Sequence, residues 1–278
     1  MQKFTVQKNQ KLSEFLFDAY GSELSYSKFC MLLRKKDIKI NSKRVNKDCL
    51  VTACDIIECY YDGQKKPLEI VYCDENIVVC NKPQGITSED YYNNVKGEYP
   101  TAYFTHRLDR NTSGLIIFAL NEKSYTELLK GFKQRTFEKY YTCLVNGVFE
   151  KQSGELNDYM VKDSEQSLVK VYSKKVDNSL AICTRYEQLV CGNISSVLKV
   201  ELVTGRTHQI RAHLAYYGHF IIGDGKYGKE SVNREFKQSK QLLIASSLTL
   251  KFNSESPLYY LNGKTFSVDD RVVFEKIK

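Results

Sequence analysis

The sequence has 278 residues, of which 42% are hydrophobic and 27% are charged, a composition typical of soluble globular proteins with one large or two modest domains. No apolar run approaches the length of a membrane-spanning helix, and the polar, lysine-bearing start lacks the apolar core of a signal peptide. The formal net charge of +8 permits an anionic partner, and nine cysteines without a CxxC pair predict reduced thiols in a cytoplasmic protein.

Residues 1–62 are predicted to form a small module of their own. Apolar residues at helical spacing predict a helix at residues 11–20, and Ser25 or Ser27 can cap a second helix directly after it. Alternating apolar and polar residues at 38–45 predict a two-stranded ribbon beside these helices. The module is therefore expected to be a small α/β domain.

Basic residues are concentrated in this module. Between residues 28 and 47 there are eight basic residues and one acid, so nearly all of the net charge is local. Such a surface suits the phosphates of a nucleic acid, although a run of charge can also be merely solvated. The residues that we assign to phosphate contact are Lys28, Arg34, Lys35, Lys36, Lys39, Lys43 and Arg44.

A polar stretch then separates this module from the rest of the chain. We place a linker at residues 63–67 and a second domain at residues 68–278. Two β-type runs open the second domain and lead into a loop with Lys82 and Pro83. Lys82 can neutralise a substrate phosphate or can simply hold the turn, and the sequence leaves both interpretations open.

The next segment, residues 104–114, is a polar loop that runs directly into an apolar stretch typical of a buried strand. It contains one carboxylate, Asp109, between Arg107 and Arg110. An aspartate is ordinarily ionised at neutral pH and acts as a nucleophile without a general base. A rigid strand can hold such a loop carboxylate against a substrate. Taken alone, however, this short motif more often indicates a turn held by an ion pair.

Further elements follow in the second domain. An amphipathic helix is predicted at residues 122–132, and an alternating strand at residues 135–147 carries Tyr141. Residues 150–180 are polar and are interpreted as connections, after which two paired strands extend to residue 203.

A last helix is predicted after Thr204, which is placed to cap it, and this helix contains Arg211. The four histidines show no spacing typical of a metal site, so no metal ligand is expected. The glycine-rich stretch at residues 223–228 lacks the spacing of a phosphate-binding loop.

Three strings in the second domain resemble the motifs of the RluA-type pseudouridine synthases. They are HRLDRNTSGL at residues 106–115, KYYTCLVNG at residues 139–147 and TGRTHQIRAH at residues 204–213. The resemblance implies that Asp109 is the essential catalytic residue, that Tyr141 packs on the target base, and that Arg211 forms an ion pair with Asp109. It also implies that Arg107 fills the stack that a flipped-out nucleotide leaves. Arg110 and Lys82 are our further candidates for RNA contact.

Residues 1–62 resemble the α-L RNA-binding module first named from a ribosomal protein. The shared features are a Ser-x-Ser helix start, a strand of the VxVN type and a late strand entry at Asp55. The sequence departs from the usual pattern at Tyr26, Asp37 and Cys54.

These resemblances imply an α+β protein, in which a mixed, largely antiparallel catalytic domain follows a small α/β RNA-binding domain. The expected activity is isomerisation of uridine to pseudouridine in structured RNA, with no cofactor, by a monomeric enzyme. Large-subunit ribosomal RNA is the first expected substrate and transfer RNA the second. The intermediate can be a covalent ester or a glycal. The rival hypothesis is a non-catalytic RNA-binding or ribosome-assembly factor.

Overall fold

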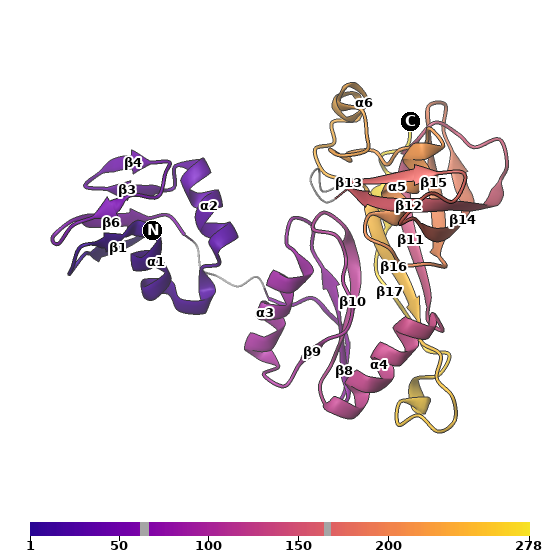
Figure 1. Ribbon diagram of the computed structural model, residues 1–278, viewed down its shortest axis with the longest axis horizontal. Helices are drawn as coiled ribbons and strands as arrows, with labels where there is room; N and C mark the ends of the chain where they lie inside the picture. The colour runs from indigo at the N-terminus through magenta and orange to yellow at the C-terminus, as the bar shows by residue number, and fades with distance from the viewer. Residues whose placement is uncertain (62–66, 164–167) are drawn as a thin grey trace. The chain divides into compact units, whose positions relative to one another are not determined.

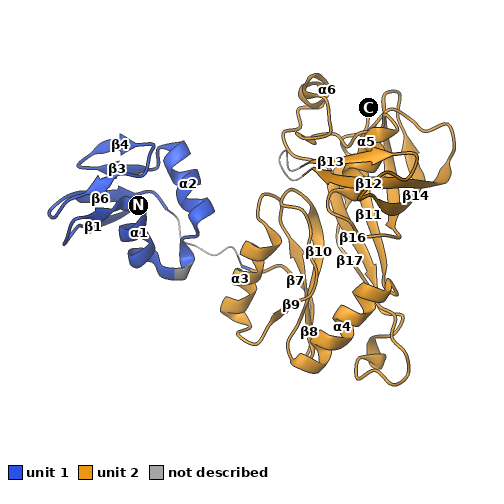
Figure 2. Ribbon diagram, viewed as in Figure 1, with its two compact units in different colours: residues 1–67 blue, residues 68–278 orange. Residues whose placement is uncertain are grey.

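The computed structural model describes residues 1–61, 67–163 and 168–278 (Figure 1). The chain divides into two compact units, residues 1–67 and 68–278 (Figure 2). The second unit begins at the residue where we expected the catalytic domain to start. The expected linker, except for Pro67, lies outside the described residues.

The first unit is a four-stranded antiparallel sheet with two helices, in the strand order β1-β6-β3-β4. Its elements are β1 (Gln2–Thr5), β2 (Gln10–Lys11), α1 (Leu12–Tyr20), the 3₁₀ turn η1 (Gly21–Glu23), α2 (Tyr26–Lys35), β3 (Ile38–Ile40), β4 (Lys43–Val45), β5 (Leu50–Val51) and β6 (Ile56–Cys59). Both helices contribute to one apolar core, with Leu12, Leu16 and Phe29 fully enclosed.

Two local features of this unit match the sequence expectations. Ser25 caps α2, because its hydroxyl accepts a hydrogen bond from the backbone N–H of Lys28 at 3.4 Å. The ribbon turns at Asn41 and Ser42, which both have positive φ angles, as the tight turns of hairpins require.

The second unit is built on a long sheet in the order β13-β12-β14-β15-β11-β16-β10-β8-β7. Its strands are β7 (Ile70–Cys73), β8 (Ile77–Lys82), β9 (Tyr103–Phe104), β10 (Ser113–Ala119), β11 (Glu138–Asn146), β12 (Ser153–Asp163), β13 (Leu168–Tyr172), β14 (Leu180–Cys191), β15 (Ser195–Leu202), β16 (Leu243–Thr249) and β17 (Thr265–Ser267). Its helices are α3 (Ser88–Glu98), α4 (Glu122–Gln134), α5 (Gln209–Tyr216), α6 (Glu230–Glu235) and α7 (Arg271–Phe274), with a 3₁₀ turn η2 (Tyr259–Leu261).

The expected mixed, largely antiparallel α+β fold is confirmed. Among the described strands, β10 and β16 are the parallel neighbours in an otherwise antiparallel sheet. None of the helices in the described part of the chain combines the length and apolar character needed to cross a bilayer.

Strand β10 lies at the centre of this fold because both of its faces are buried. Ile116 and Phe118 pack into a cluster with residues of α3, whereas Leu115 and Ile117 pack into a cluster with Leu128 of α4. Burial on both faces explains why this strand has a continuous apolar sequence instead of an alternating one. The loop with Asp109 therefore enters a rigid strand.

Gly114 allows β10 to lie close to β16. Its φ angle is 112°, and a Cβ atom at this position would lie 2.3 Å from the backbone oxygen of Ala245. Only glycine accommodates both the backbone angle and this contact. The sequence Thr-Ser-Gly thus fixes the point at which the loop with Asp109 joins β10.

Two sequence expectations were wrong. Residues 150–180, interpreted as connections, contain the eleven-residue strand β12 and the strand β13. Thr204 does not cap α5, because the helix begins only at Gln209. The Thr204 hydroxyl instead accepts a hydrogen bond from Cys183 N at 2.9 Å and donates one to the Gln209 side chain at 2.8 Å.

Candidate active site

A cavity of about 560 Å³ opens in the second unit, beside the loop that carries Asp109. It is lined by that loop, by the end of α4, by β11 and by the segment that leads into α5. Asp109, Tyr141 and Arg211, which the sequence places on three separate elements, all line this cavity. The structure therefore brings the three expected catalytic residues together.

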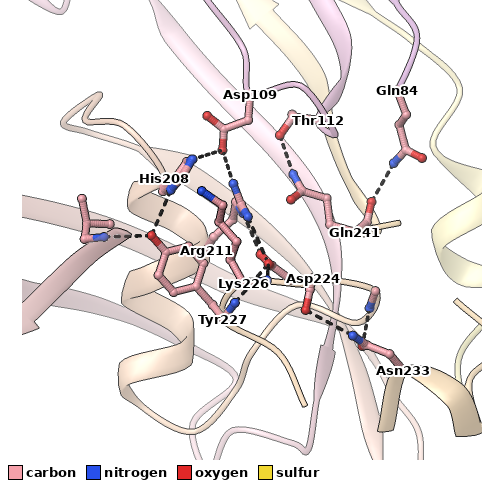
Figure 3. Close-up of polar contacts among 12 residues, drawn as sticks. Gln84, Asp109, Thr112, His208, Arg211, Asp224, Lys226, Tyr227, Asn233 and Gln241 are labelled. Atoms are coloured by element: carbon pink, nitrogen blue, oxygen red, sulfur yellow. Dashed lines mark hydrogen bonds and ion pairs between the residues drawn. The ribbon is translucent and has the colours of Figure 1, made fainter. Parts of the chain in front are cut away.

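Arg211 connects Asp109 to a second carboxylate (Figure 3). Its Nη1 donates a hydrogen bond to Asp109 Oδ2 at 2.8 Å, while Nε and Nη2 donate to the two oxygens of Asp224 at 2.6 and 3.0 Å. The ion pair with Asp109 was expected, whereas the two-pronged contact that Arg211 makes with Asp224 was not. Asp109 Oδ1 accepts no hydrogen bond from the described residues.

The surroundings of Asp224 keep this ion pair charged. Burial alone would raise the pKa of Asp224, but the hydrogen bonds and charge of Arg211 outweigh it and hold that pKa below its ordinary value. Burial likewise would lower the pKa of Arg211, and its bonds to Asp224 and Asp109 raise it instead. Arg211 is thus a fixed cation that faces Asp109.

The loop around Asp109 is held by several buried hydrogen bonds. Its turn closes where Thr112 N donates to Asp109 O at 3.1 Å. Gln241 Nε2 donates to the Thr112 hydroxyl at 2.7 Å, and Gln84 Nε2 donates to the Gln241 carbonyl at 2.6 Å (Figure 3). On the other side, the buried Ser88 hydroxyl bonds both Leu108 N and Leu108 O at 2.8 Å. These bonds fix the position of the carboxylate.

Tyr141 and His106 form an uncharged wall of the cavity. Burial, followed by the nearby charge of Asp109, raises the pKa of Tyr141, so its hydroxyl keeps its proton at neutral pH. His106 Nε2 accepts a hydrogen bond from Ile117 N at 3.1 Å, and its ring lies 4.4 Å from that of Phe132. Burial and the charge of Lys139 lower the pKa of His106 to about 3, so this ring is neutral.

The rest of the cavity wall is strongly basic. Lys139 lies two residues before Tyr141 on β11 and therefore on the same face of the strand. Burial, and then the charge of Arg135, lower the pKa of Lys139. Among the described residues, the side chain of Lys139 has no ion-pair or hydrogen-bond partner. The cations that line the cavity are Arg107, Lys133, Arg135, Lys139, Arg206 and Arg211, against the single carboxylate of Asp109.

The expected RNA contacts around the loop have different environments. Arg107 is largely exposed at the cavity, with Glu89 at 3.5 Å. Arg110 is also exposed. Lys82 is instead fully buried, and its Nζ donates to the backbone oxygens of Pro83, Ile86 and Arg110. The geometry thus contradicts phosphate contact by Lys82 and matches the alternative interpretation, a lysine that holds the turn.

In the first unit, Lys28 lies in the first turn of α2, and the other assigned basic residues lie at the C-terminal end of α2 and on the β3–β4 ribbon. Lys28 Nζ donates to Glu23 O and Tyr61 Oη at 3.0 Å, and Lys39 Nζ donates to Tyr60 Oη at 2.9 Å. Both are thus partly occupied within the unit. The residues that are exposed are Arg34, Lys35, Lys36, Lys43 and Arg44.

Several residues around Asp109 had not been assigned from the sequence. Asp224, His208 and Tyr227 contact the Asp109–Arg211 pair or each other, and Lys139 and Arg206 line the cavity. The signals were present, since His208 lies in the Arg211 string and Asp224 and Tyr227 lie in the glycine-rich stretch at 223–228. Spacing gave no indication that these two stretches meet.

Comparison with known proteins gives consistent results. A family model described as RNA pseudouridylate synthase matches residues 76–216. An uncharacterized RNA pseudouridine synthase of Mycoplasma capricolum is 30% identical over 95% of this chain and 96% of its own length. The dual-specificity RNA pseudouridine synthase RluA of Haemophilus influenzae is 33% identical over 68% of this chain and 93% of its own length.

A solved structure agrees with these sequence matches. Human RNA pseudouridylate synthase domain containing 1 superimposes with a TM-score of 0.61 at 25% identity, covering 76% of this chain and 94% of that one. Fold and site together define an RNA pseudouridine synthase, an isomerase, which confirms the expected enzyme class. The chain belongs to the RNA pseudouridylate synthase family and is of the RluA type.

Proposed function

We propose that this enzyme converts uridine to pseudouridine through Asp109, acting on a flipped-out nucleotide of large-subunit ribosomal RNA. One observation carries the proposal: Asp109 is held on one oxygen by Arg211, while its other oxygen accepts no hydrogen bond from the described residues. A carboxylate that is fixed and half unoccupied at a cavity is suited to attack a carbon atom. Arg211 and Tyr141 complete the set, the first by orienting the carboxylate and the second by carrying a proton near it.

The chemistry requires no redox step. In the simplest scheme, Asp109 attacks ribose C1′ and the bond from C1′ to uracil N1 breaks, with the electron pair leaving on the uracil. The uracil then turns, its C5 bonds to C1′ as Asp109 leaves, C5 loses its proton and N1 gains one. Because the proton lost at C5 equals the one gained at N1, the product is an isomer.

The cavity suits a single extruded nucleotide. Its volume of about 560 Å³ lies within the range of small-molecule sites, and apolar side chains such as Leu108 and Phe132 adjoin the basic wall. Extruding a base from a folded RNA costs a few kcal/mol. Exposed Arg107, at the cavity and next but one to Asp109, is placed to fill the vacated stack.

We propose that the first unit binds RNA as an α-L module. The exposed cations of this unit lie at the end of α2 and on the ribbon, and none of them has a described carboxylate within ion-pair distance. The half-buried Lys39 differs, because it pairs with Glu58 at 3.6 Å. Phosphate contacts of this kind release counterions, so binding is expected to weaken steeply with salt.

The substrate assignment rests on the named relatives. One is the ribosomal large subunit pseudouridine synthase C of Vibrio cholerae, 30% identical over 71% of this chain. The name of the Haemophilus protein indicates two specificities without naming the RNAs, and transfer RNA stays our second candidate. The nine free thiols fit the cytoplasm, where both RNAs occur. We propose that the enzyme acts there as a monomer.

The test is release of tritium from C5 of [5-³H]uridine-labelled large-subunit ribosomal RNA, with Asp109→Asn run in parallel. Release by the wild type and none by the variant is the expected result. Release that persists in Asp109→Asn would remove Asp109 as the nucleophile. Release from transfer RNA but not from ribosomal RNA would leave the chemistry in place and change the substrate.

A further inference from the structure

The glycine-rich stretch at residues 223–228 has no role in the proposed chemistry. It contacts Arg211 and His208, the two side chains that lie beside the carboxylate of Asp109 (Figure 3). Asp224 binds Arg211, and three residues later Tyr227 binds His208. The stretch is itself fixed, since Gly223 N donates to Asn233 Oδ1 at 2.7 Å and Asn233 Nδ2 donates to Asp224 O at 3.1 Å. One short turn therefore positions two side chains that converge on the same carboxylate oxygen.

His208 is the less obvious of these two side chains. Its Nε2 lies 3.9 Å from Asp109 Oδ2, the oxygen that Arg211 also contacts, and its ring lines the cavity. Its backbone has a φ angle of 56°, a left-handed conformation that is uncommon for a residue other than glycine. Such a conformation persists where the surrounding structure holds it, and it is concentrated at functional sites.

The hydrogen bonds of Tyr227 favour one tautomer of His208. Val169 N donates to Tyr227 Oη at 3.0 Å, so the single hydroxyl proton of Tyr227 is available for His208 Nδ1 at 2.9 Å. Burial lowers the pKa of His208, more than the charge of Asp109 raises it, so the ring is neutral and has one proton. With Nδ1 as the acceptor, that proton is on Nε2 and faces Asp109.

The opposite tautomer would reverse the interaction. It would turn a lone pair on Nε2 toward the anionic oxygen, which would repel the carboxylate. The separation of 3.9 Å is longer than a hydrogen bond, but such contacts in ligand-free sites often shorten when substrate binds. The direction of the N–H group therefore decides whether His208 holds Asp109 or displaces it.

We propose that His208 is a positioning residue for Asp109: held by Tyr227 with its proton on Nε2, it supplies Oδ2 with a second donor beside Arg211. Two donors on Oδ2 leave Oδ1 as the oxygen directed at the bound nucleotide. This inference rests on the proposed role of Asp109 as nucleophile. It assigns to the stretch at 223–228 the function of setting the geometry of the carboxylate.

The experiment measures the single-turnover rate of tritium release and, separately, the affinity for RNA. His208→Asn keeps a residue that tolerates the left-handed backbone, but its amide reaches only the position of Nδ1. We expect its rate to fall about tenfold with unchanged RNA affinity, as for one lost donor. His208→Gln, whose amide nitrogen reaches the position of Nε2, is expected to recover part of the rate.

Tyr227→Phe provides the decisive comparison, since it removes one oxygen and leaves His208 in place. If Tyr227 acts through His208, this change lowers the rate in the wild type but has little further effect in His208→Asn. The matched control is Tyr217→Phe, which removes a partly buried hydrogen bond from a tyrosine hydroxyl to Asp158 at 2.7 Å. Tyr217 makes no contact with Asp109, Arg211 or His208 among the described hydrogen bonds, so this variant is expected to keep the wild-type rate.

Two results would overturn the inference: a wild-type rate for His208→Asn, or equal losses from Tyr227→Phe in both backgrounds. Circular dichroism of each variant shows whether it is folded. A failure of the proposed function would give a different result. Asp109→Asn would then still release tritium, whether or not the His208 variants lose rate.

Discussion

Asp224 contacts Arg211 through both carboxylate oxygens, at 2.6 Å from Nε and 3.0 Å from Nη2, and so leaves Nη1 of Arg211 to bind Asp109. Asp224 is fully enclosed, whereas Asp109 keeps 18% of its side chain exposed. The buried carboxylate orients the guanidinium, and the exposed one is available for chemistry. The position of Asp109 thus depends on a residue that does not line the cavity.

Asp224→Asn tests this dependence. The amide keeps the shape of the side chain but removes the charge that balances Arg211, which leaves a buried cation with one partner. Breaking a buried ion pair typically costs about 3 kcal/mol or more, so we expect the free energy of unfolding to fall by about that amount. The rate of tritium release should fall at least about tenfold at saturating RNA. Urea denaturation and single-turnover assays measure the two effects.

The control for this change is Asp269→Asn, an exposed carboxylate paired with Arg271 at 2.7 Å. Exposed pairs contribute about 1 kcal/mol or less, so both stability and rate should stay near the wild type. A stable Asp224→Asn enzyme with an unchanged rate would show that Asp109 holds Arg211 without help.

Much of this site could be predicted from short strings of sequence. The strings with Asp109, Tyr141 and Arg211 were each specific, and β10 was apolar enough to be recognised as buried. The contacts of Asp224 and His208 could not be predicted, because the fold brings Asp224, in the loop after α5, back onto Arg211 in that helix. Strand β12 was missed because one of its inward residues, Asp158, is polar, which hides the alternation. Asp158 is buried against His213 and Tyr217, at 3.0 and 2.7 Å.

Tyr141→Phe tests the role of the phenolic hydroxyl. Burial raises the pKa of Tyr141, so the wild-type hydroxyl is a proton donor at neutral pH. The phenylalanine ring retains the packing surface for a base, and RNA affinity should therefore change little. If the hydroxyl transfers a proton during the reaction, the rate should fall about 100-fold or more. An unchanged single-turnover rate would limit Tyr141 to packing.

Lys139→Gln tests whether the basic wall binds a phosphate. A Cβ atom at Gly205 would lie 3.6 Å from Lys139 Nζ, so the absence of a side chain at residue 205 leaves space beside this cation. Loss of one phosphate contact should weaken RNA binding and lower the slope of log Kd against log salt by about 1. Lys123→Gln, an exposed lysine of α4 away from the cavity, is the control and should leave the slope unchanged.

Lys82→Met tests whether Lys82 holds its turn or contacts a phosphate of the RNA. Because Lys82 is fully buried, the variant should bind RNA with wild-type affinity and the same salt dependence.

Burial lowers the pKa of Lys82 to about 8, below its ordinary value, although the charge of Asp109 opposes the shift. Between these two pKa values the unfolded chain holds more protons at this residue than the folded chain, so raising the pH favours folding. The free energy of unfolding of the wild type should therefore increase relative to Lys82→Met from about pH 8 to about pH 10.5, by about 3 kcal/mol. Chemical denaturation of both proteins across this range measures the difference. If the variant instead binds RNA more weakly and with less salt dependence, Lys82 contacts a phosphate of the RNA.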